Sequence, residues 1–262
     1  MKRKICLFDI DGTLLDHFNG GILPKSAHLA LTMLRQNNHI IGIASGKGPV
    51  YIENFIPDIK FDTYIALNGN YVMLEGKLIY KDVFDKDLAA KFVNFCIEKD
   101  IPFSVGDIDG TKTLWENNQS ILNYYNGFNM DYPRLVESID NLDDIMQMTI
   151  CITKEREKEI LPFFPEMIFA RMNLYGLNVN PGGGLKEKGI KALLDNSDYT
   201  ADDLVVFGDG LNDIGMFDLA NTSVALGNAD PLLKKHATYI TDFVNEQGIY
   251  NACFHLGLIY KK

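Results

Sequence analysis

Hydrophobic and polar positions in the first eighty residues alternate between strand-like and helix-like patterns. Short apolar runs at 5–8, 40–44 and 63–67 predict buried strands, because polar or turn residues bound each run. Between them, residues 24–37 carry apolar side chains at helical spacing, and residues 49–55 predict a shorter helix. This β-α-β-α-β order predicts a parallel sheet with helices on its faces.

The last eighty residues resume the same alternation. The patterns there predict, in order, a helix at 185–194, a strand at 204–207, a helix at 213–219, a strand at 223–226, a short strand at 239–241 and a helix at 244–255. Because the two ends of the chain share one pattern, we expect residues 1–81 and 181–262 to form a single α/β core domain.

The middle of the chain, residues 82–180, is less regular. The patterns predict a helix at 86–98, a hairpin around Asp109-Gly110, a strand at 145–152, a helix at 154–161 and a strand at 174–179. Runs of strands with few helices are typical of α+β folds. We therefore predict a separate α+β domain inserted into the core.

Composition narrows the function classes. The 262 residues carry a formal net charge of -10 and are 47% hydrophobic. An acidic chain of this kind lacks the basic face of a general nucleic-acid or anionic-membrane binder, so we expect neither partner. No apolar run is long enough to span a bilayer. The four cysteines are far apart, which predicts reduced thiols and a cytoplasmic protein.

The first candidate site follows directly on the first strand, as Asp9-Ile10-Asp11-Gly12-Thr13. Side chains two apart on an extended segment point the same way, so Asp9 and Asp11 can reach one ligand. Two like charges buried together are unfavourable unless a cation or a shared proton compensates them. The spacing therefore predicts a metal site in which one carboxylate attacks and the other moves a proton.

The same five residue types recur at Asp107-Ile108-Asp109-Gly110-Thr111. There they lie between two strand-like runs, and Asp-Gly between strands is typical of a hairpin turn. We interpret this second copy as a turn without catalytic function, because a motif outside its structural context is weak evidence.

Two further polar clusters follow predicted strands of the core. Ser45-Gly46-Lys47 follows the strand at 40–44, and Gly208–Asp213 follows the strand at 204–207. Ligands of open α/β sheets bind at the carboxyl ends of the strands, so these clusters and Asp9 should meet at one edge. Lys188, on the helix at 185–194, is a further candidate, with Lys186 as its rival two residues away.

In this order, the motifs resemble those of the haloacid dehalogenase superfamily, and within it the Cof-type phosphatases. The resemblance rests on Asp9–Thr13, Ser45, Lys188-Gly189 and Gly208–Asp213, and it is supported by Asn68-Gly69, Gly227-Asn228-Ala229, Thr241 and Gln247-Gly248. It implies a doubly wound, Rossmann-like core and assigns residues 82–180 to an inserted α+β cap domain that sets substrate choice.

The resemblance also implies a reaction, the Mg²⁺-dependent hydrolysis of small phosphomonoesters. Asp9 would be the nucleophile that forms an aspartyl-phosphate, and Asp11 would be the general acid and base. Ser45 and Lys188 would hold the phosphoryl oxygens. Further substrate contacts would come from Gly12, Gly46 and Asn212.

The cofactor implied by the resemblance is Mg²⁺, which prefers oxygen ligands. Asp9, the backbone carbonyl of Asp11 and Asp209 would supply these oxygens, with Asp213 as a further metal-site carboxylate. The expected partner is a small phosphorylated metabolite, such as a sugar phosphate, pyridoxal phosphate or a nucleotide-derived ester.

Two alternatives stay open at this point, a phosphomutase similar to the phosphomannomutases and a non-catalytic sensor of phosphorylated ligands. Lys47 stands where the family most often has Arg. Because lysine cannot bind an anion through the two parallel bonds of an arginine, the resemblance assigns no substrate contact to this position. Arg171 and Asn173, near the last strand of the insert, are candidate substrate contacts.

Overall fold

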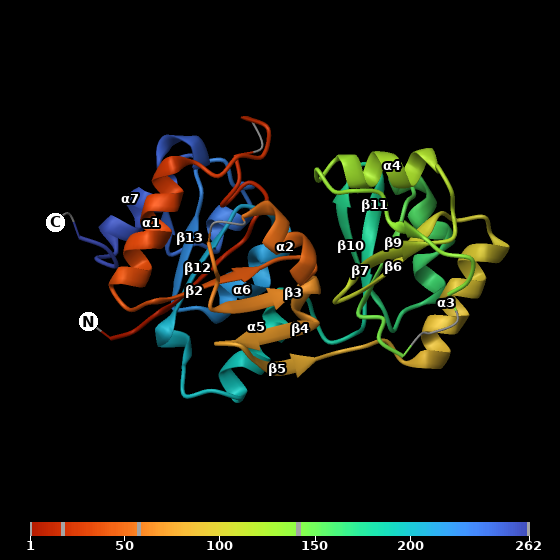
Figure 1. Ribbon diagram of the computed structural model, residues 1–262, viewed down its shortest axis with the longest axis horizontal. Helices are drawn as coiled ribbons and strands as arrows, with labels where there is room; N and C mark the ends of the chain where they lie inside the picture. The colour runs from red at the N-terminus through yellow and green to blue at the C-terminus, as the bar shows by residue number, and fades with distance from the viewer. Residues whose placement is uncertain (1, 17–18, 57–58, 140–142, 261–262) are drawn as a thin grey trace. The chain divides into compact units, whose positions relative to one another are not determined.

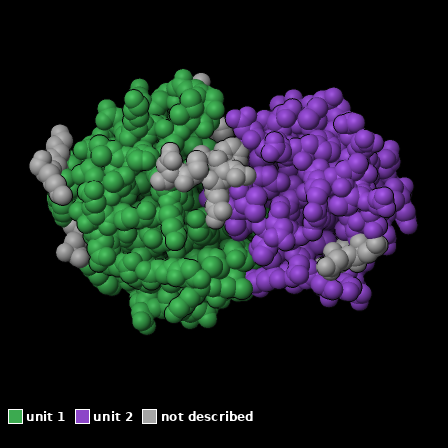
Figure 2. Space-filling model, viewed as in Figure 1, with its two compact units in different colours: residues 1–45, 56–80, 186–262 green, residues 46–55, 81–185 purple. Residues whose placement is uncertain are grey.

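The computed structural model describes residues 2–16, 19–56, 59–139 and 143–260, and every structural statement below concerns these residues. The chain divides into two compact units, shown in green and purple in Figure 2. The first unit comprises residues 1–45, 56–80 and 186–262, and the second comprises residues 46–55 and 81–185. The second unit thus begins and ends close to the predicted insert and also takes in residues 46–55.

The first unit is built on an eight-stranded sheet with the order β14-β13-β12-β1-β2-β3-β4-β5 (Figure 1). Neighbouring strands are parallel from β14 to β3, and β4 is antiparallel to β3. This confirms the predicted α/β fold. The strands are β1 (Ile5–Phe8), β2 (Ile40–Ala44), β3 (Thr63–Ala66), β4 (Tyr71–Leu74), β5 (Lys77–Lys81), β12 (Leu204–Gly208), β13 (Thr222–Ala225) and β14 (Tyr239–Ile240).

Strand β1 is central and buried on both of its faces, which explains its unbroken apolar sequence. Ile5 and Leu7 belong to a core cluster with residues of α5 (Lys186–Asp195) and α6 (Ile214–Leu219). On the other face, Cys6 lies near Cys253 of α7 (Gly248–His255), which packs against α1 (Lys25–Gln36). Helices therefore cover both faces, and all four cysteines are buried and free, as expected.

The hairpin of β4 and β5 was not predicted from the sequence. Glu75 and Gly76 form its two-residue turn with φ angles of 47° and 80°. Such positive φ values suit a hairpin turn and favour glycine at the second position. The predicted strand at 63–67 ends one residue early, because Leu67 and Asn68 enter a short 3₁₀ turn with positive φ.

The second unit has a six-stranded sheet with the order β10-β11-β9-β6-β7-β8. A core cluster packs helix α3 (Lys86–Glu98) against the sheet, and Asn118 caps α4 (Gln119–Asn126) because its side chain accepts two backbone N–H groups. The strands are β6 (Phe103–Asp107), β7 (Gly110–Thr113), β8 (Arg134–Leu135), β9 (Gln147–Ile150), β10 (Ile168–Asn173) and β11 (Gly176–Asn180).

The helix predicted at 154–161 forms as two 3₁₀ segments, Lys154–Glu159 and Leu161–Phe163. The first segment has the sequence KEREKE and so offers no apolar face for packing. Pro162 removes a backbone donor in the second segment, which prevents one continuous α-helix.

The second copy of the pentapeptide forms the turn between β6 and β7. Asp107 pairs with Gly110, so Ile108 and Asp109 make the two-residue loop, one position earlier than predicted. The Asp107 carboxylate accepts a hydrogen bond from the backbone N–H of Asp109, at 2.8 Å. This local bond is typical of a turn-forming aspartate.

Residues 46–55 connect β2 to β3 of the first unit, yet they pack within the second. The hydroxyls of Tyr51, on α2 (Pro49–Phe55), and Thr111, on β7, form a hydrogen bond of 2.7 Å. The Lys47 ammonium lies 5.2 Å from the centre of the Phe128 ring. These contacts fix the segment that follows Ser45 onto the second unit.

Candidate active site

The candidate site is built around Asp9, the first residue after β1. Its backbone N–H donates to Phe207 of β12, at 3.0 Å, so the strand pairing continues to Asp9 and holds its backbone in place. The residue is 7% exposed. The ammonium of Lys186, at the start of α5, donates to Oδ1 of Asp9, at 2.6 Å. The nucleophile candidate is therefore buried, ion-paired and fixed in orientation.

Lys186 bridges Asp9 to Asp213. Its ammonium also lies 2.6 Å from Oδ1 of Asp213, and both side chains are fully buried. The other oxygen of Asp213 accepts the backbone N–H groups of Asp209 and Gly210, each at 3.0 Å. Asp213 thereby anchors the lysine to the turn after β12.

Asp209 completes a cluster of three carboxylates. One oxygen from each of Asp9, Asp209 and Asp213 lies within 4.8 Å of the others, a spacing that suits a bound cation. The hydroxyl of Thr13 donates to Oδ1 of Asp209, at 2.7 Å. Gly12 has φ +88°, and a Cβ there would lie 2.2 Å from Oδ2 of Asp209, so only glycine fits at this position.

The charges of this cluster do not balance. The pKa of Asp9 is raised to about 7, chiefly by burial and also by the nearby Asp213 and Asp11, against the opposing effect of Lys186. Burial, followed by the charge of Asp9, raises the pKa of Asp209 to about 8. Three carboxylates and one ammonium carry two net negative charges, which a divalent cation would neutralise. The donor set therefore fits a metal with oxygen ligands.

The lysine of the site corrects the sequence prediction. The lysine that contacts Asp9 is Lys186, and not the predicted Lys188. Burial lowers the pKa of the Lys186 ammonium, but the stronger combined effect of Asp213 and Asp9 leaves this pKa above its usual range. Lys188 lies half-buried on the same helix. Residues two apart on a helix point about 200° away from each other, so both lysines cannot face Asp9.

The remaining predicted residues lie at the same sheet edge or next to it. Asp11 is half-buried and close enough to Asp9 to raise its pKa. Ser45 is buried directly after β2, and its backbone N–H donates to the backbone oxygen of Ile65, at 2.9 Å. The amide oxygen of Asn212 lies against Gly210, since a Cβ there would be 2.6 Å from it. Gly46 is the first residue of the second unit.

Sequence reasoning missed Thr13 and Asn228 as parts of this network. The side chain of Asn228 donates to the backbone oxygen of Gly12, at 2.7 Å, and accepts the N–H of Val244, at 3.0 Å. The motif Gly227-Asn228-Ala229 was noted in the sequence, but its contact with the first motif needs the fold.

Arg171 and Asn173 make structural contacts within the second unit. The Arg171 guanidinium pairs with Glu157, at 2.5 Å, and donates to the backbone oxygen of Ile152. The amide of Asn173 donates to the backbone oxygen of Tyr124, at 3.2 Å. These bonds explain both residues without a substrate.

Comparison with known proteins identifies the family. The sequence pattern of the haloacid dehalogenase-like hydrolases matches residues 6–253. The chain belongs to this family. The motifs at Asp9–Thr13 and Gly208–Asp213 predicted this membership, and the chain is thus an enzyme of the hydrolase class.

Individual relatives cover nearly the whole chain. The chain is 31% identical over 259 residues to YkrA of Bacillus subtilis (strain 168), named as a candidate phosphatase, with 99% of this chain and 100% of the relative covered. A protein of Geobacillus kaustophilus HTA426 has a similar solved structure, with TM-score 0.90, 30% identity and coverage of 98% and 100%. The solved structure of the HAD subclass IIB sugar phosphatase BT4131 has TM-score 0.86, 30% identity and the same coverage.

None of the helices in the described parts of the chain has both the length and the apolar character needed to cross a membrane.

Proposed function

We propose that this haloacid dehalogenase-like hydrolase is a Mg²⁺-dependent phosphatase of small phosphomonoesters that works through an aspartyl-phosphate on Asp9. The observation that carries the proposal is the buried ammonium of Lys186 between Asp9 and Asp213, beside the Asp209 carboxylate. A nucleophilic carboxylate splits one difficult displacement into two easier steps.

Lys186 serves Asp9 in two ways. Its bond to Oδ1 favours the ionised carboxylate against the effect of burial and leaves Oδ2 as the atom that attacks phosphorus. An ammonium has three donors, and in the described parts of the chain Asp9 and Asp213 take two of those of Lys186. In this proposal the third donates to a phosphoryl oxygen, whose growing charge it stabilises in the transition state.

Asp11 acts as the general acid and base. It protonates the leaving oxygen when Asp9 attacks, and it then takes a proton from the water that cleaves the aspartyl-phosphate. Its side chain is half-buried, so it is more accessible to substrate and water than Asp9. Ser45, Gly12, Gly46 and Asn212 are proposed to contribute hydroxyl, amide and backbone contacts to the phosphate.

The metal in this proposal is Mg²⁺, held by Asp9, the backbone carbonyl of Asp11 and Asp209, with Asp213 close by. When bound, it would neutralise charge on the transferred phosphoryl group. The unbalanced charge of the three-carboxylate cluster supports this assignment.

Removal of the metal has an expected result that can be measured in two ways. EDTA should abolish phosphate release and Mg²⁺ should restore it, while Ca²⁺ should restore it poorly because its coordination is less regular. Mg²⁺ should also raise the melting temperature, and more strongly at pH 8 than at pH 6. Protons compete for Asp9 and Asp209, whose pKa values in the metal-free protein are about 7 and about 8.

The sign of the pH effect follows from these raised pKa values. Between about pH 4 and pH 8 Asp9 and Asp209 hold more protons in the folded metal-free protein than in the unfolded chain, so their contribution to stability falls as pH rises. Mg²⁺ offsets that loss. Asp209→Asn should remove the thermal shift, and Asp109→Asn, in the β6–β7 turn, should keep it. An identical melting temperature with and without Mg²⁺ at pH 8 would contradict the metal site.

We propose that the second unit, predicted from sequence as a cap at 82–180, determines which phosphomonoester is accepted. All side chains assigned above to chemistry lie in the first unit. The relatives support small metabolites as substrates, since one is a sugar phosphatase and YcsE of Bacillus subtilis, 23% identical, is named a 5-amino-6-(5-phospho-D-ribitylamino)uracil phosphatase.

A panel of phosphomonoesters tests the proposed reaction. Purified protein with Mg²⁺ should release inorganic phosphate from one or more sugar or polyol phosphates. A phosphomutase would instead return the phosphoryl group to the sugar, which ³¹P NMR distinguishes from hydrolysis. If neither release nor transfer occurs with any member of the panel, the sensor alternative replaces the proposed function.

A further inference from the structure

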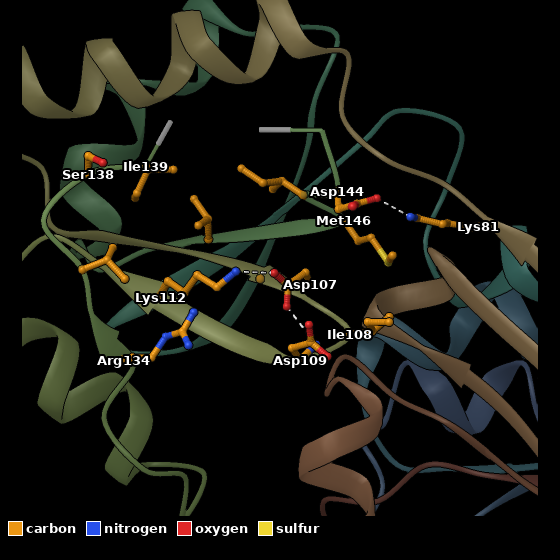
Figure 3. Close-up of a pocket in the computed structure, with 14 residues that line it drawn as sticks. Lys81, Asp107, Ile108, Asp109, Lys112, Arg134, Ser138, Ile139, Asp144 and Met146 are labelled. Atoms are coloured by element: carbon orange, nitrogen blue, oxygen red, sulfur yellow. Dashed lines mark hydrogen bonds and ion pairs between the residues drawn. The ribbon is translucent and has the colours of Figure 1, made fainter. Parts of the chain in front are cut away.

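The second unit holds a pocket of about 390 Å³ that the chemistry above does not use (Figure 3). It lies against β6, β7 and β8, and Val136, Ser138, Ile139 and Asp144 are also among its lining residues. Val105, Ile145 and Met146 line it with buried apolar side chains. Half of its lining residues are polar or charged, and its volume lies within the range of small-molecule sites.

Two cations project into this pocket from neighbouring strands. In the sheet, Lys112 of β7 lies opposite Val105 of β6 on one side and opposite Arg134 of β8 on the other. Lys112 and Arg134 therefore share one face of the sheet and extend into the same hollow (Figure 3). Like charges on directly opposed residues are unfavourable, so the pair indicates a site for a negative group.

Only part of this positive charge is neutralised by the protein. The Lys112 ammonium lies 2.6 Å from Oδ2 of Asp107. At the rim, Lys81 and Asp144 pair with each other. Among the described residues, the guanidinium of Arg134 has no hydrogen-bonding or ion-pairing partner. Arg134 is exposed, so the pocket combines buried apolar side chains with a guanidinium that no described residue binds and whose donors match a carboxylate in a two-bond arrangement.

The acidic residues around the pocket decide between anions. Asp107, Asp109 and Asp144 all line it, so a doubly charged phosphate would meet repulsion that a single carboxylate largely avoids. Asp109 lies three residues along the chain from Lys112, which is about 10 Å of strand. That distance leaves room for a carboxylate at Arg134 while the body of the ligand covers the apolar lining.

We propose that this pocket binds a small organic carboxylate with an apolar body. Arg134 grips the carboxylate, and Lys112 adds charge from the neighbouring strand. Val105, Ile145 and Met146 contact the apolar body. The site lies entirely within the second unit, so it is independent of the phosphatase proposal.

The test is a calorimetric titration of the full-length protein with 4-phenylbutyrate, in phosphate-free buffer. Saturable binding is expected for the wild type. Arg134→Ala should weaken it about tenfold or more, and Arg134→Lys should weaken it less, because one charge-assisted bond survives. Arg156→Ala is the matched control, since Arg156 is an exposed arginine of the same unit that pairs with Glu159. Its affinity should equal that of the wild type.

Two further ligands test separately whether binding needs the carboxylate charge and whether it needs the apolar body. The neutral amide 4-phenylbutanamide should bind at least about tenfold more weakly than the carboxylate. Inorganic phosphate should also bind more weakly, because it leaves the apolar lining uncovered. The proposal is overturned if the wild type shows no saturable binding of 4-phenylbutyrate, if Arg134→Ala binds it as tightly as the wild type, or if phosphate binds equally well.

Discussion

Asp9→Asn is expected to lower kcat by about four to six orders of magnitude, because the amide cannot attack phosphorus. The fold should survive, since asparagine has nearly the same shape as aspartate. Burial already disfavours the charged carboxylate, as its pKa of about 7 shows. The metal-free variant should therefore melt at pH 8 at the same temperature as the wild type or higher.

The second copy of the pentapeptide provides the matched control. Asp109→Asn makes the same chemical change in the turn between β6 and β7, where Asp109 offers only its backbone N–H to Asp107. Its rate of phosphate release should stay within about twofold of the wild type. Loss of activity in Asp109→Asn together with full activity in Asp9→Asn would reverse the assignment of the two copies.

Lys186→Met is expected to reduce both activity and stability. The change leaves Asp9 and Asp213 buried without their shared cation, and breaking a buried pair from one side costs about 3–5 kcal/mol. Phosphate release should fall by at least about a thousandfold, because the nucleophile loses its orientation and the transition state loses a positive charge. Urea denaturation and a phosphate-release assay measure the two effects.

Two further variants separate catalysis from folding. Lys188→Met removes the same charge two residues away and should change activity and the free energy of unfolding only slightly. Lys186→Met combined with Asp213→Asn removes both members of one buried pair, so stability should partly return while activity stays lost. An inactive Lys188→Met variant beside a fully active Lys186→Met variant would restore the original sequence prediction.

The helical face of α5 selects Lys186, whereas the Lys-Gly motif selects Lys188. Lys186, Ile190 and Leu193 are spaced by four and seven residues, so they lie on one face, and all three are buried. From Lys188 the same spacings lead to the small residue Ala192, which is buried, and to Asp195, which is exposed. A lysine on the apolar face of an amphipathic helix indicates a buried charge with a partner.

The contacts between distant parts of the site could not be predicted, because local sequence patterns do not contain the strand order. The parallel core was predicted well, because strands buried on both faces have continuous apolar sequences. The contacts of Asn228 with Gly12 and of Thr13 with Asp209 join residues about two hundred positions apart. Such contacts are fixed by strand order, which a single sequence does not give directly. The helix prediction at 154–161 was wrong, because charged residues such as those of the 3₁₀ segment Lys154–Glu159 are also common in α-helices.

The packing of residues 46–55 has a consequence for exchanging parts between relatives. Because this segment belongs to the second unit, the chain passes between the units four times, after residues 45, 55, 80 and 185. A chimaera that replaced only residues 81–185 would separate Tyr51 from Thr111 and Lys47 from Phe128. The module that can be transplanted as a whole is therefore discontinuous in sequence, and recombination at two crossover points would not transfer it intact.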